Sequence, residues 1–151
     1  MADKLSATLE DYLGVILGFQ REKRFARVSD ISAGLGVAKS AVTAALQNLS
    51  ARGLVNYKAY EPVTLSEEGE QLAEDIVLRH RVILDFLRDV LGIEPAEAES
   101  IAGEMEHAIS PPALEKFVCF LAFIGTQTGK GKTWLKDFQR FSRSGAKGRS
   151  C

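Results

Sequence analysis

The stretch ARVSDISAGLGVAKSAVTAALQNLSARGLV, residues 26–55, decides the fold. Apolar side chains recur at helical spacing on both sides of Gly36, which supplies the permissive backbone of a tight turn. The spacing predicts two short helices, the first capped by Ser29 or Asp30 and the second ending at Gly53. The apolar positions of the pair are Ile31, Leu35, Val37, Val42, Ala45, Leu46 and Leu49.

A helix precedes this pair and a β-hairpin follows it. Ser6 is placed to N-cap a first helix that we expect to end near Glu22 or Lys23. Short β-type runs at 54–57 and 63–65 predict a small hairpin. This order is the outline of a winged helix-turn-helix, with a helical bundle carrying an incidental hairpin as the alternative. The apolar stripe of the first helix is Leu9, Tyr12, Leu13, Ile16 and Leu17.

The remaining residues predict an all-helical segment. Ser66 opens a long helix to about Leu91. Another helix begins in GIEPAEAES (92–100), continues through IAGEMEHAIS (101–110), and is broken by two prolines. A last helix is expected from Lys132 to Phe141. The fold class is therefore mainly α, with expected domains at 1–65, 66–141 and, as a flexible basic tail, 142–151.

The helix after the prolines is apolar on two faces. One stripe contains Leu114, Phe117 and Leu121, while Phe120 and Phe123 lie on a second side. A helix of this kind needs two surfaces to pack against, and in so short a chain we expect one of them to be another subunit.

Charge is segregated along the chain, although the formal net charge is only −1. Residues 1–65 carry +2, residues 66–110 carry −9 and residues 111–151 carry +6. The basic ends suggest an anionic partner, and the acidic middle suggests cations or solvated helix faces. The longest apolar run has eight residues, too few for a membrane span, and the N-terminus lacks a signal-like apolar segment, so we expect a cytoplasmic protein. Two cysteines cannot form a disulfide framework.

Two histidines are the candidate metal ligands. His107 follows Glu106 on a predicted helix whose apolar residues face a core, and a buried imidazole and carboxylate need a partner. A divalent metal would be such a partner, and mixed nitrogen and oxygen donors are typical of Mn, Fe or Zn. His80 lies on an apolar stripe, where a purely structural histidine is the alternative.

Four segments resemble the diphtheria-toxin-repressor family of metal-dependent regulators, within it the short manganese-transport regulators. These segments are LEDYLGVI (9–16), residues 26–55, LRHRVILDFL (78–87) and EMEHAIS (104–110). The resemblance implies a homodimer that binds duplex DNA when metal orders the first helix against the dimerisation domain. It places the metal ligands at Asp11, His80, Glu106 and His107, with Mn or Fe as the ion in cells and Zn or Ni as ions a purified sample can hold.

Two positions depart from the family pattern. Gly14 and Gly103 stand where the family supplies side-chain ligands. We therefore expect one metal ion, with Glu99 or Glu104 as possible substitutes for a missing ligand. A winged-helix regulator with a degenerate metal site, responding to another signal, remains the alternative.

The second helix of the turn is expected to enter the major groove by its N-terminal end. Lys39, Ser40, Thr43 and Gln47 lie on that side, and Gln47 can pair with adenine. Arg27, Ser29 and Lys58 are candidates for phosphate contacts, which position a protein without specifying sequence.

Other functions find less support. GTQTGKGKT (125–133) resembles a phosphate loop, but Thr126 stands where its first glycine would fall and the stretch follows a helix. An enzyme would need an open metal position and a general base beyond the ligands, so we expect none. A protein-interaction module without DNA affinity is a further alternative.

Overall fold

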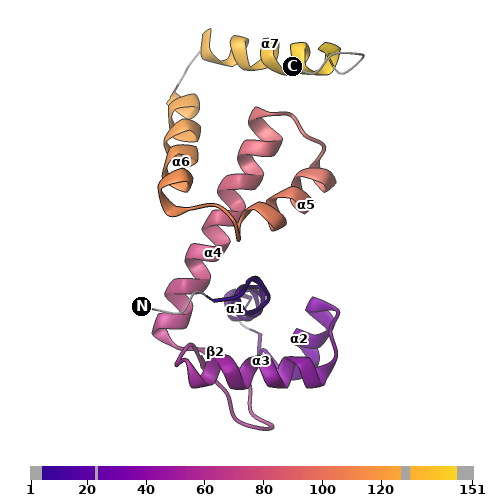
Figure 1. Cartoon of the computed structure of the whole chain (residues 1–151), viewed down its shortest axis with the longest axis vertical. Coiled ribbons are helices and arrows are strands. Elements are labelled where there is room, and N and C mark those ends of the chain that lie inside the picture. The colour runs from indigo at the N-terminus through magenta and orange to yellow at the C-terminus, as the bar shows by residue number, and fades with distance from the viewer. Residues whose placement is uncertain (1–4, 23, 127–129, 146–151) are drawn as a thin grey trace. The chain divides into compact units, whose positions relative to one another are not determined.

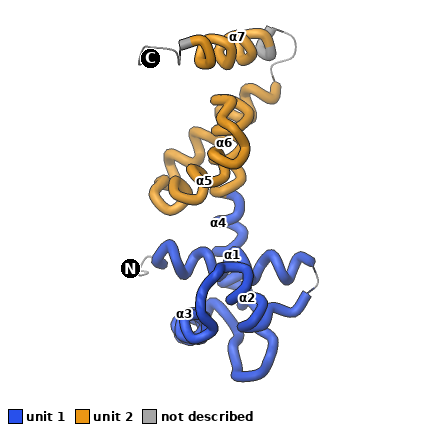
Figure 2. Tube along the Cα trace, turned by 90° about the vertical axis from the view of Figure 1, so that its right-hand side faces the viewer, with its two compact units in different colours: residues 1–78 blue, residues 79–151 orange. Residues whose placement is uncertain are grey.

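The computed structural model describes residues 5–22, 24–126 and 130–145, and it is mainly helical, as predicted (Figure 1). It forms two compact units, residues 1–78 and 79–151, which divide inside helix α4 (Glu67–Asp85) (Figure 2). Each unit has its own hydrophobic cluster. Within the described ranges, no helix is long and apolar enough to cross a membrane. Residues 127–129 of the phosphate-loop-like stretch and residues 146–151 of the expected tail lie outside the description.

Helix α1 (Ala7–Arg21) begins and ends where the sequence predicts. The Ser6 hydroxyl accepts a hydrogen bond from the Leu9 N–H at 3.4 Å, which satisfies one backbone donor of the first turn. Glu22 is the C-terminal cap. The predicted stripe faces the core, with Leu9 partly buried against it and four members buried: Tyr12, Leu13, Ile16 and Leu17.

Helices α2 (Val28–Leu35) and α3 (Lys39–Ala51) form the predicted pair, and Gly36 between them has the left-handed φ of 66°. The predicted cap of the first helix is wrong. Arg27 occupies the N-cap without a side-chain hydrogen bond, and Ser29 and Asp30 lie in the first turn. The Arg27 carbonyl accepts the first helical hydrogen bonds, from the N–H groups of Asp30 and Ile31, both at 2.9 Å.

The hairpin pairs strands β1 (Val55–Asn56) and β2 (Thr64–Leu65) in antiparallel register, with Val55 opposite Leu65. An isolated bridge from Ala26 to Val63 extends the pairing toward α2. The hairpin is therefore joined to the helix pair, and the winged helix-turn-helix prediction is confirmed.

Helix α4 starts against the hairpin. The Ser66 hydroxyl accepts from the Gly69 N–H at 3.0 Å, as expected of an N-cap. A Cβ at position 69 would overlap the carbonyl of Leu54, so only glycine allows this close approach. The core of the first unit lies between these elements and includes the fully buried Leu13, Ile16, Ile31, Val42, Leu46, Leu49 and Val63.

The helix from Ser66 does not stay regular to Leu91 as expected. It changes to a π-helical segment, η1 (Phe86–Val90), that continues directly from α4. Helix α5 (Pro95–Met105) is capped by the Glu94 carboxylate, which accepts from the N–H groups of Ala96 and Glu97 at 3.0 and 3.2 Å. The cluster of the second unit consists of Ile83, Leu87, Ala98 and Ala102.

The expectation that α5 runs to the prolines is wrong. The helix ends at Met105, and the N–H groups of Ala108 and Ile109 both bond to the Met105 carbonyl in a turn. Pro111 instead begins helix α6 (Pro111–Thr126), because a proline at the first helical position loses no internal hydrogen bond. Glu106 and His107 therefore lie just after a helix.

Helix α6 packs by one side against η1. The Phe86 ring meets the rings of Phe117 and Phe120 edge-on, with centroids 4.7 and 5.8 Å apart. None of its residues is buried in the single chain, and Val118 and Phe123 are 42% and 56% exposed. Val118 and Phe123 are therefore left largely uncovered by the part of the chain that the structure describes.

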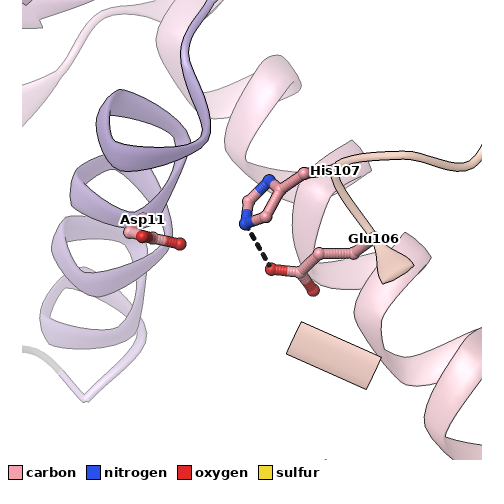
Figure 3. A group of neighbouring side chains, drawn as sticks. All are labelled: Asp11, Glu106 and His107. Atoms are coloured by element: carbon pink, nitrogen blue, oxygen red, sulfur yellow. Dashed lines mark ion pairs between the residues drawn. The ribbon is translucent and has the colours of Figure 1, made fainter. Parts of the chain in front are cut away.

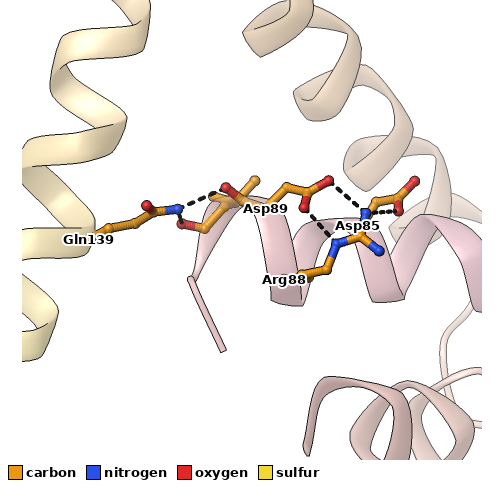
Figure 4. A network of polar contacts seen from close by, with 5 residues as sticks. Asp85, Arg88, Asp89 and Gln139 are labelled. Carbon is orange, nitrogen blue, oxygen red and sulfur yellow. Dashed lines mark hydrogen bonds and ion pairs between the residues drawn. The ribbon is translucent and has the colours of Figure 1, made fainter. Parts of the chain in front are cut away.

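Helix α7 (Lys130–Gly145) extends beyond the expected end at Phe141, and the Ser142 and Arg143 side chains donate to the carbonyl of Gln139. The Gln139 amide itself donates to the carbonyls of Asp89 and Val90 at 2.9 and 3.3 Å (Figure 4). These bonds satisfy carbonyls at the end of η1 and attach α7 to it.

Candidate metal centre and nucleic-acid interface

His80, on α4, lies between two carboxylates. Its Nδ1 is 2.6 Å from Oε2 of Glu106, and its Nε2 is 2.9 Å from Oε1 of Glu99, on α5. The imidazole is 28% exposed, whereas the Glu106 side chain is only 9% exposed. A half-buried histidine with an acidic partner at each nitrogen is a polar centre inside the second unit.

Glu106 also joins this centre to His107. Its second oxygen, Oε1, is 3.4 Å from Nε2 of His107, and Figure 3 shows the imidazole turned toward the carboxylate. The Arg79 guanidinium donates to the backbone carbonyl of Glu106 at 3.3 Å. Neighbouring residues of α4 thus hold the backbone and the side chain of the turn that bears Glu106 and His107.

The charge balance favours a cation here. Burial lowers the pKa of His80, but the hydrogen bond to Glu99 and the charge and hydrogen bond of Glu106 outweigh it, so the pKa is raised above its ordinary value. A site that stabilises positive charge and presents imidazole and carboxylate donors fits a divalent transition metal.

Within the second unit, the structure brings together the three predicted ligands that this unit contains: His80, Glu106 and His107. Asp11, the fourth, is exposed on α1 and belongs to the first unit. Both nitrogens of His80 have acidic partners, an arrangement that suits a purely structural histidine as well as a metal ligand. The sequence did not predict a role for Arg79, which contacts the Glu106 backbone. Its position next to His80 was the one indication that the sequence offered.

Glu99 and Glu104 differ in the structure, although the sequence left both open as substitute ligands. Glu99 contacts His80, while Glu104 is exposed. Glu99 lies four residues before Gly103, which places both on one side of α5.

The predicted DNA contacts gather around the start of α3. Arg27, Ser29, Lys39 and Thr43 line one hollow of about 460 Å³, closed on its other side by residues of the hairpin. Ser40, Gln47 and Lys58 are exposed outside it. The Thr43 hydroxyl donates to the Lys39 carbonyl at 3.0 Å, which leaves its oxygen able to accept.

The lining of this hollow also includes residues that were not predicted, and Tyr60 is one of them. Tyr60, in the loop of the hairpin, is fully exposed and has a left-handed φ of 67°. For a bulky residue this conformation is an outlier, and such strain clusters at functional sites. The sequence carried no signal for it beyond the turn-like KAYEP (58–62).

Two family models cover most of the chain. Residues 4–63 match the N-terminal DNA-binding domain of the iron-dependent repressors, and residues 66–135 match their metal-binding and dimerisation domain. The chain belongs to the iron-dependent repressor family. Its fold and the resemblance seen in the sequence are thereby confirmed.

Relatives within this family are transcriptional regulators. The chain is 35% identical over 118 residues to an uncharacterised helix-turn-helix regulator of Methanocaldococcus jannaschii, covering 78% of this chain and 94% of that protein. It is 37% identical over 112 residues to the transcriptional regulator MntR of Escherichia coli, covering 74% and 72%.

A solved member of the family has the same fold. The structure described as a manganese-dependent transcriptional repressor in complex with manganese superposes with a TM-score of 0.70 at 29% identity, over 76% of this chain. The match covers 53% of that protein, so the chain spans about half the length of this solved regulator.

Gly14 and Gly103, the two positions that depart from the pattern of the resemblance, border open space. A Cβ at Gly14 or Gly103 would meet no atom within 4 Å. Packing therefore does not require glycine at either position.

Proposed function

We propose that this chain is a metal-responsive, DNA-binding transcriptional regulator that acts as a homodimer and represses genes of metal uptake. The observation that carries the proposal is the linked set of His80, Glu106 and His107, within the segment that matches a metal-binding and dimerisation domain. Family membership and the manganese-bound relative support Mn²⁺ or Fe²⁺ as the physiological ion, with Zn²⁺ or Ni²⁺ able to occupy the site in a purified sample.

The proposed ligands are Asp11, His80, Glu106 and His107. A bound divalent cation would supply positive charge to carboxylates and imidazoles that otherwise share protons. One ion is proposed because Gly14 and Gly103 offer no side-chain donor for a second. Because Asp11 comes from α1, the ion would require a ligand from the DNA-binding unit.

The domains proposed are DNA-binding at 1–65 and dimerisation and metal-binding at 66–141, followed by a basic tail at 142–151. Two exposed apolar side chains of α6, Val118 and Phe123, support dimerisation. In a dimer of this fold, the two α3 helices contact two half-sites of duplex DNA.

For DNA, we assign sequence contacts to Lys39, Ser40, Thr43 and Gln47, and phosphate contacts to Arg27, Ser29 and Lys58. The hollow shared by Arg27, Ser29, Lys39 and Thr43 supports this assignment. We further propose that the protein is not an enzyme, because its candidate metal donors are all assigned as ligands, and that it works in the cytoplasm.

Metal-dependent DNA affinity is the test. Duplexes selected from a random pool by the Mn²⁺-loaded protein are titrated by fluorescence anisotropy at fixed salt, with and without Mn²⁺, because salt alone changes affinity strongly. We expect Mn²⁺ to raise the affinity and His107→Ala to abolish the rise. Equal affinity with and without metal would contradict metal control, and no duplex affinity at about 50 mM salt would favour a protein-interaction module.

The second candidate keeps the dimeric DNA-binding fold and drops metal control. The glycines at 14 and 103 favour it, since two donors of the family pattern are absent. Calorimetric titration with Mn²⁺, Fe²⁺ and Zn²⁺ separates the two candidates: micromolar binding excludes a degenerate site.

A further inference from the structure

Glu99 is an acidic residue beside the centre that the family ligand pattern does not include. We propose that Glu99 is a positioning residue that accepts the Nε2 proton of His80 and orients its Nδ1 for metal, and that it is not itself a ligand. The inference rests on the proposed function, because it assumes that His80, Glu106 and His107 hold the ion.

The two sides of the His80 ring are not equivalent. On the Nδ1 side, Glu106 approaches to 2.6 Å and its other oxygen reaches His107 at 3.4 Å. On the Nε2 side, Oε1 of Glu99 lies at 2.9 Å. The other candidate ligands of this unit, Glu106 and His107, therefore lie on the Nδ1 side of the ring.

Imidazole geometry then separates the roles of the two carboxylates. The ring nitrogens point in different directions, so an ion shared with Glu106 and His107 is reached from Nδ1. A neutral imidazole that gives Nδ1 to a metal carries its proton on Nε2, where Glu99 accepts it. A carboxylate that bonds the second nitrogen of a metal-bound histidine fixes both the tautomer and the ring orientation.

Burial agrees with this division. The Glu106 side chain is 9% exposed, as suits a ligand, whereas that of Glu99 is 60% exposed. Glu99 is one turn before Gly103 on the same side of α5, so the helix brings a carboxylate to the ring even though position 103 has no side chain. The Glu99 carboxylate thus acts on the ion through His80, and it does not replace the side-chain ligand that is absent at Gly103.

The first test measures Mn²⁺ affinity of the full chain by calorimetry. We expect Glu99→Ala to weaken binding 10–100-fold with unchanged stoichiometry, which is the usual effect of losing such a partner. Glu99→Gln keeps an oxygen that accepts the Nε2 proton, so we expect it to recover most of the affinity. Glu104→Gln, an exposed carboxylate of the same helix, is the matched control and should bind like the unmodified chain.

Three results would overturn the proposal. Equal weakening by the Gln and Ala variants would make Glu99 a direct ligand, because an amide oxygen replaces a carboxylate poorly on Mn²⁺. If Glu99→Ala bound Mn²⁺ as tightly as the unmodified chain, Glu99 would have no role in metal binding. If Glu104→Gln weakened Mn²⁺ binding as much as Glu99→Ala, the effect would be one of overall charge. Circular dichroism of each metal-free variant checks that α5 is retained.

The second test observes the His80 ring directly. With ¹⁵N-labelled histidine and Zn²⁺ as a diamagnetic probe, NMR should show Nδ1 bound to metal and Nε2 protonated, and Glu99→Ala should shift the tautomer balance of the metal-free ring. Coordination through Nε2 would refute the inference. If the unmodified chain binds neither Mn²⁺ nor Zn²⁺, the proposed function fails; if it binds both and only the Glu99 variants behave unexpectedly, only this inference fails.

Discussion

Replacement of Tyr60 by glycine should separate stability from DNA binding. The side chain is fully exposed and its φ is 67°, a region that side chains other than glycine rarely adopt. Because the ring is exposed, its removal costs no burial. The residue lines the hollow that contains Lys39 and Arg27, so its removal changes the proposed DNA surface.

The size of the stability effect follows from two opposing terms. A left-handed conformation costs a residue with a Cβ about 1–2 kcal/mol, and glycine removes that cost. Glycine also gains freedom in the unfolded chain, which costs about 0.5–1 kcal/mol. We therefore expect Tyr60→Gly to leave the unfolding free energy unchanged or to raise it by up to about 1.5 kcal/mol.

DNA affinity should change in the opposite direction. Loss of one hydrogen bond or packing contact of the phenol is worth about 1 kcal/mol, close to five-fold in Kd. Urea unfolding and anisotropy on the same selected duplex give the two quantities. Tyr60→Asn is the matched control, since asparagine tolerates this φ without a ring. A loss of stability above 1 kcal/mol, or unchanged DNA affinity in both variants, would refute the reasoning.

Three further predictions concern the rest of the chain. Gly69→Ala should lower the urea-unfolding free energy by about 1–3 kcal/mol, because the added methyl group overlaps the Leu54 carbonyl; no loss would show that α4 can shift. Free Mn²⁺ at 100 times its Kd should raise the unfolding free energy by about 2.7 kcal/mol in calorimetry, and His107→Ala should show no rise. Phe123→Asp should weaken self-association in sedimentation equilibrium while changing monomer stability by less than about 0.5 kcal/mol, because the ring is 56% exposed; an unchanged dimer would place the interface elsewhere.

The fold was predictable where local signals agree with packing. Leu46 and Leu49 repeat at helical spacing and are fully buried, and Gly36 has the positive φ that its place between two helices suggests. The conformation of Tyr60 was not predictable, because tyrosine has no preference for a positive φ.

The end of α5 escaped prediction for a different reason. Residues after Met105 are compatible with a helix, so propensity alone continues it. In the structure, the Glu106 carbonyl bonds Arg79 and its carboxylate bonds His80, two partners supplied by α4. Contacts so distant in sequence leave no periodic pattern, and they are the contacts that form the candidate centre.

This arrangement bears on how an ion would act. Arg79 holds the backbone of Glu106, and His80 holds its carboxylate, so the turn with Glu106 and His107 is fixed within the second unit by its own hydrogen bonds. Preorganised donors lose little conformational freedom on binding, so the ordering cost of metal binding would fall mainly on the remaining proposed ligand, Asp11. Arg79→Ala should therefore weaken Mn²⁺ binding without touching a ligand, whereas Asp11→Ala should reduce the coupling of metal to DNA affinity more than metal affinity itself. Asp11→Ala could instead reduce metal affinity and the coupling of metal to DNA affinity by the same factor. In that case α1 would only supply one ligand, and control of DNA binding would have to arise within the second unit.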